Sequence, residues 1–88
     1  MTISKTGTEI TERFFNAIDR LTNDGRIRGL QTFTRKHNIN RWNLLTVRNN
    51  PQNTMLKCEY IAYLCEDFRI SPQWIILGKG DFYDTIQD

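Results

Sequence analysis

The stretch LQTFTRKHNINRWNLLTVRNN, residues 30–50, contains two short helical patterns separated by a turn. In the first pattern apolar residues recur at helical spacing up to His37, and Asn38 then follows, a residue type that tolerates the left-handed backbone at a helix end. In the second pattern Asn40 is a good N-cap for a helix over 41–49. The two predicted helices are joined by three or four residues, which is the connection length of a helix-turn-helix.

The side chains needed to hold such a helix pair together are present. Those predicted to meet between the two helices are Phe33, His37, Ile39, Leu44 and Val47. His37 occupies an inward position without a second histidine or a nearby thiol to complete a metal or catalytic site. We therefore expect His37 to be a partly buried spacer.

Three further helices are predicted around this pair from apolar spacing and from start and stop residues. From N-cap to stop they run from Thr8 to Asp24, from about Asn53 to Phe68, and from Ser71 to Gly78. No stretch shows the alternation of apolar and polar residues that is typical of a strand. The predicted fold is all-α, a compact five-helix domain over residues 8–80, with tails at 1–7 and 81–88.

The size and composition of the chain argue against an enzyme. Eighty-eight residues at 39% apolar fill one small core and leave little room for an enclosed active site. We therefore expect no catalytic residue, no small-molecule substrate and no cofactor. Two cysteines and one histidine, without a CxxC pair, cannot complete the four-ligand shell of a zinc site, so no metal is expected.

Neither a disulfide nor a membrane segment is expected. Cys58 and Cys65 are seven residues apart on one predicted helix. That spacing puts their Cα atoms about 10 Å apart, beyond disulfide range, and predicts two reduced core thiols. No run approaches the roughly 18 apolar residues of a membrane span, and residues 1–8 lack the apolar stretch of a signal peptide. The expected location is cytoplasmic, without a membrane partner.

Charge is distributed unevenly along the chain. The net charge is only +2, but residues 25–50 contain six Arg or Lys and no Asp or Glu. The segments before and after it are both net acidic. Each contact to a phosphate favours a cation and disfavours a carboxylate, so this segment is typical of a surface that faces a polyanion.

The residues of the helix pair resemble a known family. Phe33-Thr34, Asn38-Ile39, Leu44 and Val47 are similar to the motif of the lambda-repressor-like helix-turn-helix family, the phage repressor and Cro type of DNA-binding domain. A second match, ISPQWIILGKG at residues 70–80, looks like the segment that ends many phage repressor DNA-binding domains. Two matches in this order are more specific than either one.

The resemblance covers roughly residues 8–82 and implies both a fold and a function. The implied fold is a lambda-repressor-like domain, and the implied function is a sequence-specific DNA-binding transcriptional regulator, a phage-type repressor. The helix over 41–49 would read the major groove of double-stranded DNA. The family's subunit contacts imply a homodimer through the last helix and the C-terminal tail. Phe82 and Tyr83 lie beyond that helix, where we expect little of a small domain to cover them.

The candidate site residues divide into two sets. Those on the outward face of the 41–49 helix or at its start are predicted to contact bases: Asn40, Arg41, Trp42, Asn43, Thr46 and Asn49. Those around it are predicted to contact phosphates: Gln31, Arg26, Arg28, Arg35, Arg48 and Asn50. For Trp42, packing against a neighbouring helix is the alternative.

Two other kinds of function fit the same pattern. One is a protein-interaction module, in which Trp42 and the basic face meet an acidic partner. A weaker alternative is an RNA-binding protein. A winged helix is disfavoured, because a helix rather than a hairpin is predicted after Asn50.

Overall fold

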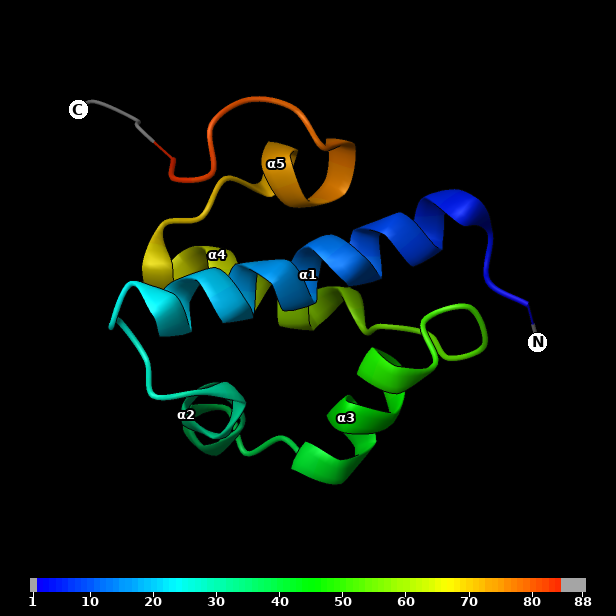
Figure 1. The fold of residues 1–88 in the computed structure, drawn as a ribbon, viewed down its shortest axis with the longest axis horizontal. Helices are drawn as coiled ribbons and strands as arrows, with labels where there is room; N and C mark the ends of the chain where they lie inside the picture. The colour runs from blue at the N-terminus through cyan, green and yellow to red at the C-terminus, as the bar shows by residue number, and fades with distance from the viewer. Residues whose placement is uncertain (1, 85–88) are drawn as a thin grey trace.

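The computed structural model describes residues 2–84, and this part of the chain folds into five helices (Figure 1). They are α1 (Lys5–Asn23), α2 (Leu30–Lys36), α3 (Arg41–Asn49), α4 (Cys58–Phe68) and α5 (Pro72–Leu77). Figure 1 shows α1 in the middle, with α2 and α3 on one side of it and α5 on the other. The predicted all-α class is confirmed. Within residues 2–84 no helix is long and apolar enough to cross a membrane.

The first helix begins earlier than predicted, because Ser4 rather than Thr8 is its N-cap. The Ser4 Oγ accepts a hydrogen bond from the Gly7 amide at 3.1 Å. The apolar pattern starts only at Ile10, and the first residues of the helix are exposed, so hydrophobic spacing could not reveal this start. Residues 5–7, expected to be part of a tail, are helical.

The fourth helix begins later than predicted, at Cys58 rather than near Asn53. The amides of Asn53 and Thr54 both donate to the carbonyl oxygen of Asn50, at 3.1 and 3.0 Å. This turn follows the end of α3 and uses the polar groups that would otherwise start a new helix. A short loop then leads to Lys57, the N-cap of α4.

The start of α4 determines the surroundings of the two cysteines, which are both free thiols. Cys65 is half-buried, and burial, together with the negative charges of Asp84 and Glu66, raises the pKa of its thiol. Cys58 lies in the first turn of α4 and is exposed. The prediction of two core thiols is therefore wrong for Cys58, because the first turn of the helix extends beyond the core.

The core forms where the other helices meet α1. Its buried apolar side chains come from all five helices and from the links: Phe14, Phe15, Ala17, Ile18, Leu21, Ile27, Leu30, Phe33, Leu44, Leu64, Ile70, Ile75 and Phe82. The rings of Phe14 and Phe33 meet edge to face, with centroids 5.7 Å apart, and tie α2 to α1. On the opposite side, Arg13 of α1 donates to the carbonyl oxygens of Ile75 and Ile76 at 2.6 and 3.0 Å. These bonds satisfy orphan carbonyls at the end of α5.

The segment after α5 is part of the core rather than an exposed tail. Phe82 is only 5% exposed, and its carbonyl oxygen accepts a hydrogen bond from the Ser71 amide at 2.8 Å. Tyr83 is half-buried and forms an isolated β-bridge with Ile70. The expected exposure of Phe82 and Tyr83 is therefore wrong, because the chain after α5 folds back along the segment that precedes it. Residues 85–88 of the predicted tail lie outside the described part.

Candidate nucleic-acid interface

The turn between α2 and α3 is held by local hydrogen bonds. Asn38 adopts the left-handed conformation, with φ 54°, as predicted. The Ile39 amide donates to the carbonyl oxygen of Thr34 at 2.8 Å, which satisfies one of the last carbonyls of α2. Asn40 caps α3, because its Oδ1 accepts a hydrogen bond from the Asn43 amide at 3.1 Å. Two helices that pack against each other are thus joined through a short turn with its own hydrogen bonds.

The α3 helix buries one side and exposes the other. Leu44 is buried and Val47 half-buried on the side that faces the core. The six residues predicted to contact bases are all exposed: Asn40, Arg41, Trp42, Asn43, Thr46 and Asn49. Trp42 is 71% exposed, so the alternative that it packs against a neighbouring helix is excluded. The exposed side of α3 therefore presents these side chains together.

Two contacts within α3 arrange its exposed side chains. The guanidinium carbon of Arg41 lies over the Trp42 ring, 5.7 Å from its centroid. The Thr46 hydroxyl donates to the carbonyl oxygen of Trp42 at 3.0 Å. The donor of Thr46 is therefore satisfied within the helix, and what the side chain offers outward is its methyl group and its oxygen lone pairs.

Two of the residues predicted to contact phosphates have free charges. Arg28 and Arg35 are exposed, and within residues 2–84 neither has a carboxylate at ion-pair distance. Both line an open hollow beside α2 together with Thr32. Gln31 is half-buried in the first turn of α2. The two arginines thus flank the helix pair as unneutralised cations.

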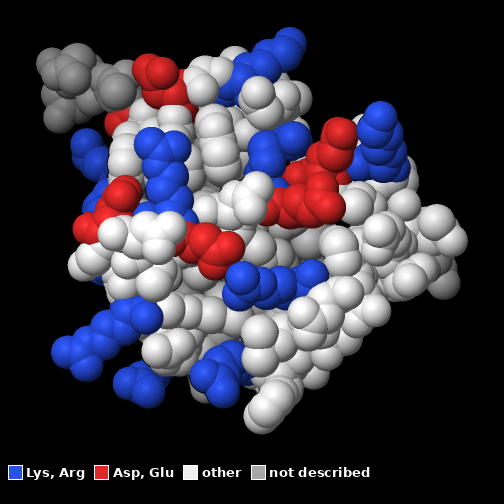
Figure 2. All heavy atoms as spheres, in the orientation of Figure 1, with Lys and Arg blue, Asp and Glu red and all other residues white. Residues whose placement is uncertain are grey.

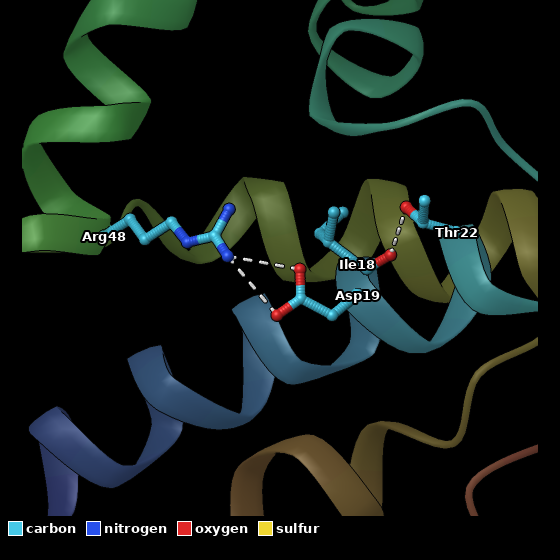
Figure 3. Close-up of polar contacts among 4 residues, drawn as sticks. All are labelled: Ile18, Asp19, Thr22 and Arg48. Atoms are coloured by element: carbon cyan, nitrogen blue, oxygen red, sulfur yellow. Dashed lines mark hydrogen bonds and ion pairs between the residues drawn. The ribbon is translucent and has the colours of Figure 1, made fainter.

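Arg48, in contrast, is paired within the molecule. Its Nη2 lies 3.2 and 3.3 Å from the two carboxylate oxygens of Asp19 on α1 (Figure 3). Both side chains are largely exposed, so the pair contributes little to stability, about 0–1 kcal/mol. The pair has a larger effect on the surface charge, since the Asp19 carboxylate cancels a positive charge on α3. Arg48 therefore differs from Arg28 and Arg35, whose positive charges are not neutralised within residues 2–84.

Arg26 and Asn50 also make contacts within the molecule. Arg26 donates from Nη1 to the carbonyl oxygen of Phe68 at 3.3 Å, and its guanidinium carbon lies 5.2 Å from the centroid of the Tyr83 ring. Asn50 donates from Nδ2 to the carbonyl oxygen of Thr46 at 3.2 Å and so helps to end α3. Both residues are exposed, but their polar ends are held by other parts of the chain.

A cluster around Asp67 connects the end of α2 to α4. The Asp67 carboxylate accepts a hydrogen bond from Lys36 at 3.1 Å and lies 2.6 Å from Nε2 of His37. The His37 ring is stacked on Tyr63, with centroids 4.2 Å apart. Burial raises the pKa of Asp67, but the hydrogen bonds from His37 and Lys36 outweigh it, so that the pKa of Asp67 lies below its ordinary value.

This cluster agrees with the prediction that His37 is partly buried, but its partners were not predicted. Asp67 and Tyr63 lie about one helical turn apart on α4, and nothing in their local spacing marks them as neighbours of α2. The cluster neutralises Lys36 and fixes the end of α2 against α4. Lys36 therefore no longer contributes an unpaired positive charge to the basic segment, residues 25–50.

The remaining charges still separate by face. In Figure 2 the lower part of the molecule, over α2 and α3, shows blue and white atoms without red ones, whereas red atoms lie over α1 and the C-terminal part. Within residues 2–84 the cations of α2 and α3 without an ion-pair partner are Arg35 and Arg41, and Arg28 lies just before α2, also without one. This face is therefore suited to a polyanion.

Elsewhere the described residues offer little that could perform chemistry. Among residues 2–84 no group of three or more His, Cys, Asp or Glu is placed to hold a metal ion. An apolar groove between the start of α1 and the loop before α4 is lined mainly by Ile3, Ile10, Met55, Leu56 and Ile61. No charged side chain lines it, so it contains no acid–base pair.

Comparisons of the chain with protein-family models, with curated proteins and with solved structures gave no match.

Proposed function

We propose that this chain is a sequence-specific DNA-binding transcriptional regulator of the phage repressor type, which inserts α3 into the major groove. The observation that carries the proposal is the exposed side of α3, where Trp42 is 71% exposed on a helix without an acidic residue. Arg suits the O6/N7 edge of guanine, and Asn suits adenine. Arg41, Asn43 and Asn49 provide these side-chain types beside Trp42.

The dimensions of α3 support this proposal. An α-helix with its side chains is about 10–12 Å across, and the major groove, about 12 Å wide, admits it; the nine residues of α3 form about two and a half turns. Four of the candidate base contacts occupy the first two turns of α3: Arg41, Trp42, Asn43 and Thr46. In a helix-turn-helix the first turns of the second helix approach the bases most closely. With α3 in the groove, the short turn at Asn38 would hold α2 next to it, where α2 would cross the DNA backbone.

Phosphate contacts would come from the unpaired arginines around α3. Arg28 and Arg35 lie outside the reading helix, and within residues 2–84 no carboxylate neutralises them. Contacts of this kind position a protein without specifying sequence. Arg48 contributes less to our proposal, because Asp19 already holds its guanidinium group.

We also propose that the chain binds DNA as a homodimer through α5. Ile76 and Leu77 are 41% and 60% exposed, and they are the large apolar side chains that α5 leaves uncovered in the described part. Two-fold dimers of helix-turn-helix proteins bind two half-sites about one helical turn apart. Sedimentation velocity tests this part, since a strict monomer both free and on DNA would contradict it.

The function itself is tested by selecting bound duplexes from a random pool and then titrating salt. We expect a preferred sequence, and an affinity that falls steeply between 50 and 200 mM salt, as counterion release requires (about 0.9 log units of affinity per log unit of salt for each phosphate contact). Random duplex that does not bind even at low salt would refute DNA binding. It would favour the second candidate, in which the same face with Trp42 binds an acidic protein.

Paired variants distinguish residues that contact bases from residues that contact phosphates. Arg41→Ala should relax the preference at one base pair by about 1–3 kcal/mol, the value of a bidentate contact, and Thr46→Ala should relax the preference at another base pair. Arg28→Ala and Arg35→Ala should instead weaken binding to all duplexes alike and reduce the salt slope by about one unit each. An unchanged preferred sequence in Arg41→Ala and Thr46→Ala, together with a changed one in Arg28→Ala, would show that α3 is not the reading helix.

A further inference from the structure

The first turns of α3 present apolar groups where a DNA-reading helix usually presents hydrogen-bonding ones. Trp42 offers a broad ring, 71% exposed, whose single polar group is the indole N–H. One turn later, Thr46 has already used its hydroxyl hydrogen on the Trp42 carbonyl oxygen, at 3.0 Å. Neighbouring positions on one face of α3 thus offer an indole ring and a methyl group.

The major groove contains one apolar group that such a surface could recognise. This is the C5-methyl of thymine, and a cytosine methylated at C5 carries the same group at the equivalent position of the ring. We infer that Trp42 and Thr46 read the C5-methyl of a pyrimidine, so that the chain distinguishes thymine or 5-methylcytosine from bases without this methyl. The inference rests on the proposed function and adds the chemical group that α3 recognises.

The neighbouring arginine limits where this pyrimidine lies. The guanidinium carbon of Arg41 is 5.7 Å from the centroid of the Trp42 ring. Base pairs are stacked about 3.4 Å apart, so two side chains at this separation reach base pairs that are one or two steps apart. Arg41 is suited to guanine. The preferred site should therefore contain a guanine within two base pairs of the methyl-bearing pyrimidine.

The test uses the duplex selected from the random pool and replaces each thymine in turn by deoxyuridine. This change deletes one methyl and leaves the hydrogen-bonding pattern of the base intact. At the thymine that Trp42 reads, we expect Kd to rise about fourfold, which corresponds to one buried methyl group. At the same position, 5-methylcytosine paired with guanine should bind about fourfold more tightly than unmethylated cytosine paired with guanine.

A double-mutant cycle assigns the effect to the side chain. In Trp42→Ala the fourfold difference between thymine and deoxyuridine duplexes should shrink, because only the Thr46 methyl remains to contact the C5-methyl. Because Trp42 is mostly exposed, this variant should unfold at the same urea concentration as the wild type. Met55→Ala is the matched control, since Met55 is also apolar and 65% exposed but lies in the loop before α4 rather than on α3. This control should keep the fourfold difference.

The outcomes separate this inference from the proposed function. A chain that selects a sequence but binds thymine and deoxyuridine duplexes equally at every position does not read a methyl, and the inference is overturned. It is also overturned if Trp42→Ala keeps the fourfold difference. Selection that yields no preferred sequence would instead contradict the proposed function itself.

Discussion

Phe82→Ala tests whether the segment after α5 belongs to the folded domain. The Phe82 ring is 5% exposed, and its centroid lies 4.8 Å from the centroids of both Trp74 and Tyr83. The guanidinium carbon of Arg20, on α1, lies 4.2 Å from the centroid of the same ring. Replacing a buried Phe by Ala removes the transfer free energy of the ring and leaves a cavity, at a cost of about 3–5 kcal/mol.

This loss is large relative to the stability expected for the chain. Eighty-eight residues correspond to a free energy of unfolding of about 4–13 kcal/mol. For a domain of this size, each kcal/mol lowers the melting temperature by about 4–8 °C. Phe82→Ala should therefore lower the melting temperature by at least about 12 °C. Urea unfolding followed by circular dichroism gives the free-energy difference directly.

Met55→Ala is the control for this measurement, because Met55 is also apolar but 65% exposed. Truncating an exposed side chain should change the free energy of unfolding by less than about 0.5 kcal/mol. A loss below about 1 kcal/mol in Phe82→Ala would show that the segment does not pack on α1 in solution. The expectation of an exposed tail would then be correct after all.

Three further predictions concern single residues. The pKa of Asp67 lies below its ordinary value of 3.8, so the ionised carboxylate stabilises the folded state. This stabilisation is complete when the pH is above 3.8, and it is lost as the pH falls through the lowered pKa. Asp67→Asn should therefore lose less stability than the wild type between about pH 6 and about pH 2 in urea titrations. Under native conditions a thiol reagent should label the exposed Cys58 faster than Cys65, whose thiol is half-buried and has a raised pKa; mass spectrometry that finds equal rates would contradict this. Asn38→Ala should cost about 1–2 kcal/mol because of its φ of 54°, whereas Asn38→Gly should cost nothing, as measured by urea unfolding.

Local chemistry made the helices and their turns predictable. Asn40 and Ser71 cap α3 and α5 through hydrogen bonds to amides three residues later, at 3.1 and 3.4 Å. Asn38 and Gly78 take up the left-handed backbone at helix ends. Each of these features depends on groups within a few residues of one another, so the sequence contains all that is needed to predict them. The exposed side of α3 follows in the same way from the helical period.

Where the local pattern was weak, the boundaries were missed. The exposed first turn of α1 lacks apolar residues, so the sequence pattern predicts Thr8 as the cap although Ser4 is the true one. The turn that Asn53 makes back to Asn50 resembled a helix start, because the same polar residue types serve both purposes.

By itself, then, the sequence determined the all-α class, the order of the helices, the turn at Asn38 and the side chains that α3 exposes. The tertiary structure decided which charges stay free and which aromatic residues are covered. Asp19 neutralises Arg48 from 29 residues away, and Phe82 reaches the core because the chain after α5 folds back along the segment that precedes α5. The physical reason is that ion pairing and burial depend on distance in space. Helix caps and periodicity depend on distance along the chain, which is the only distance that a sequence records.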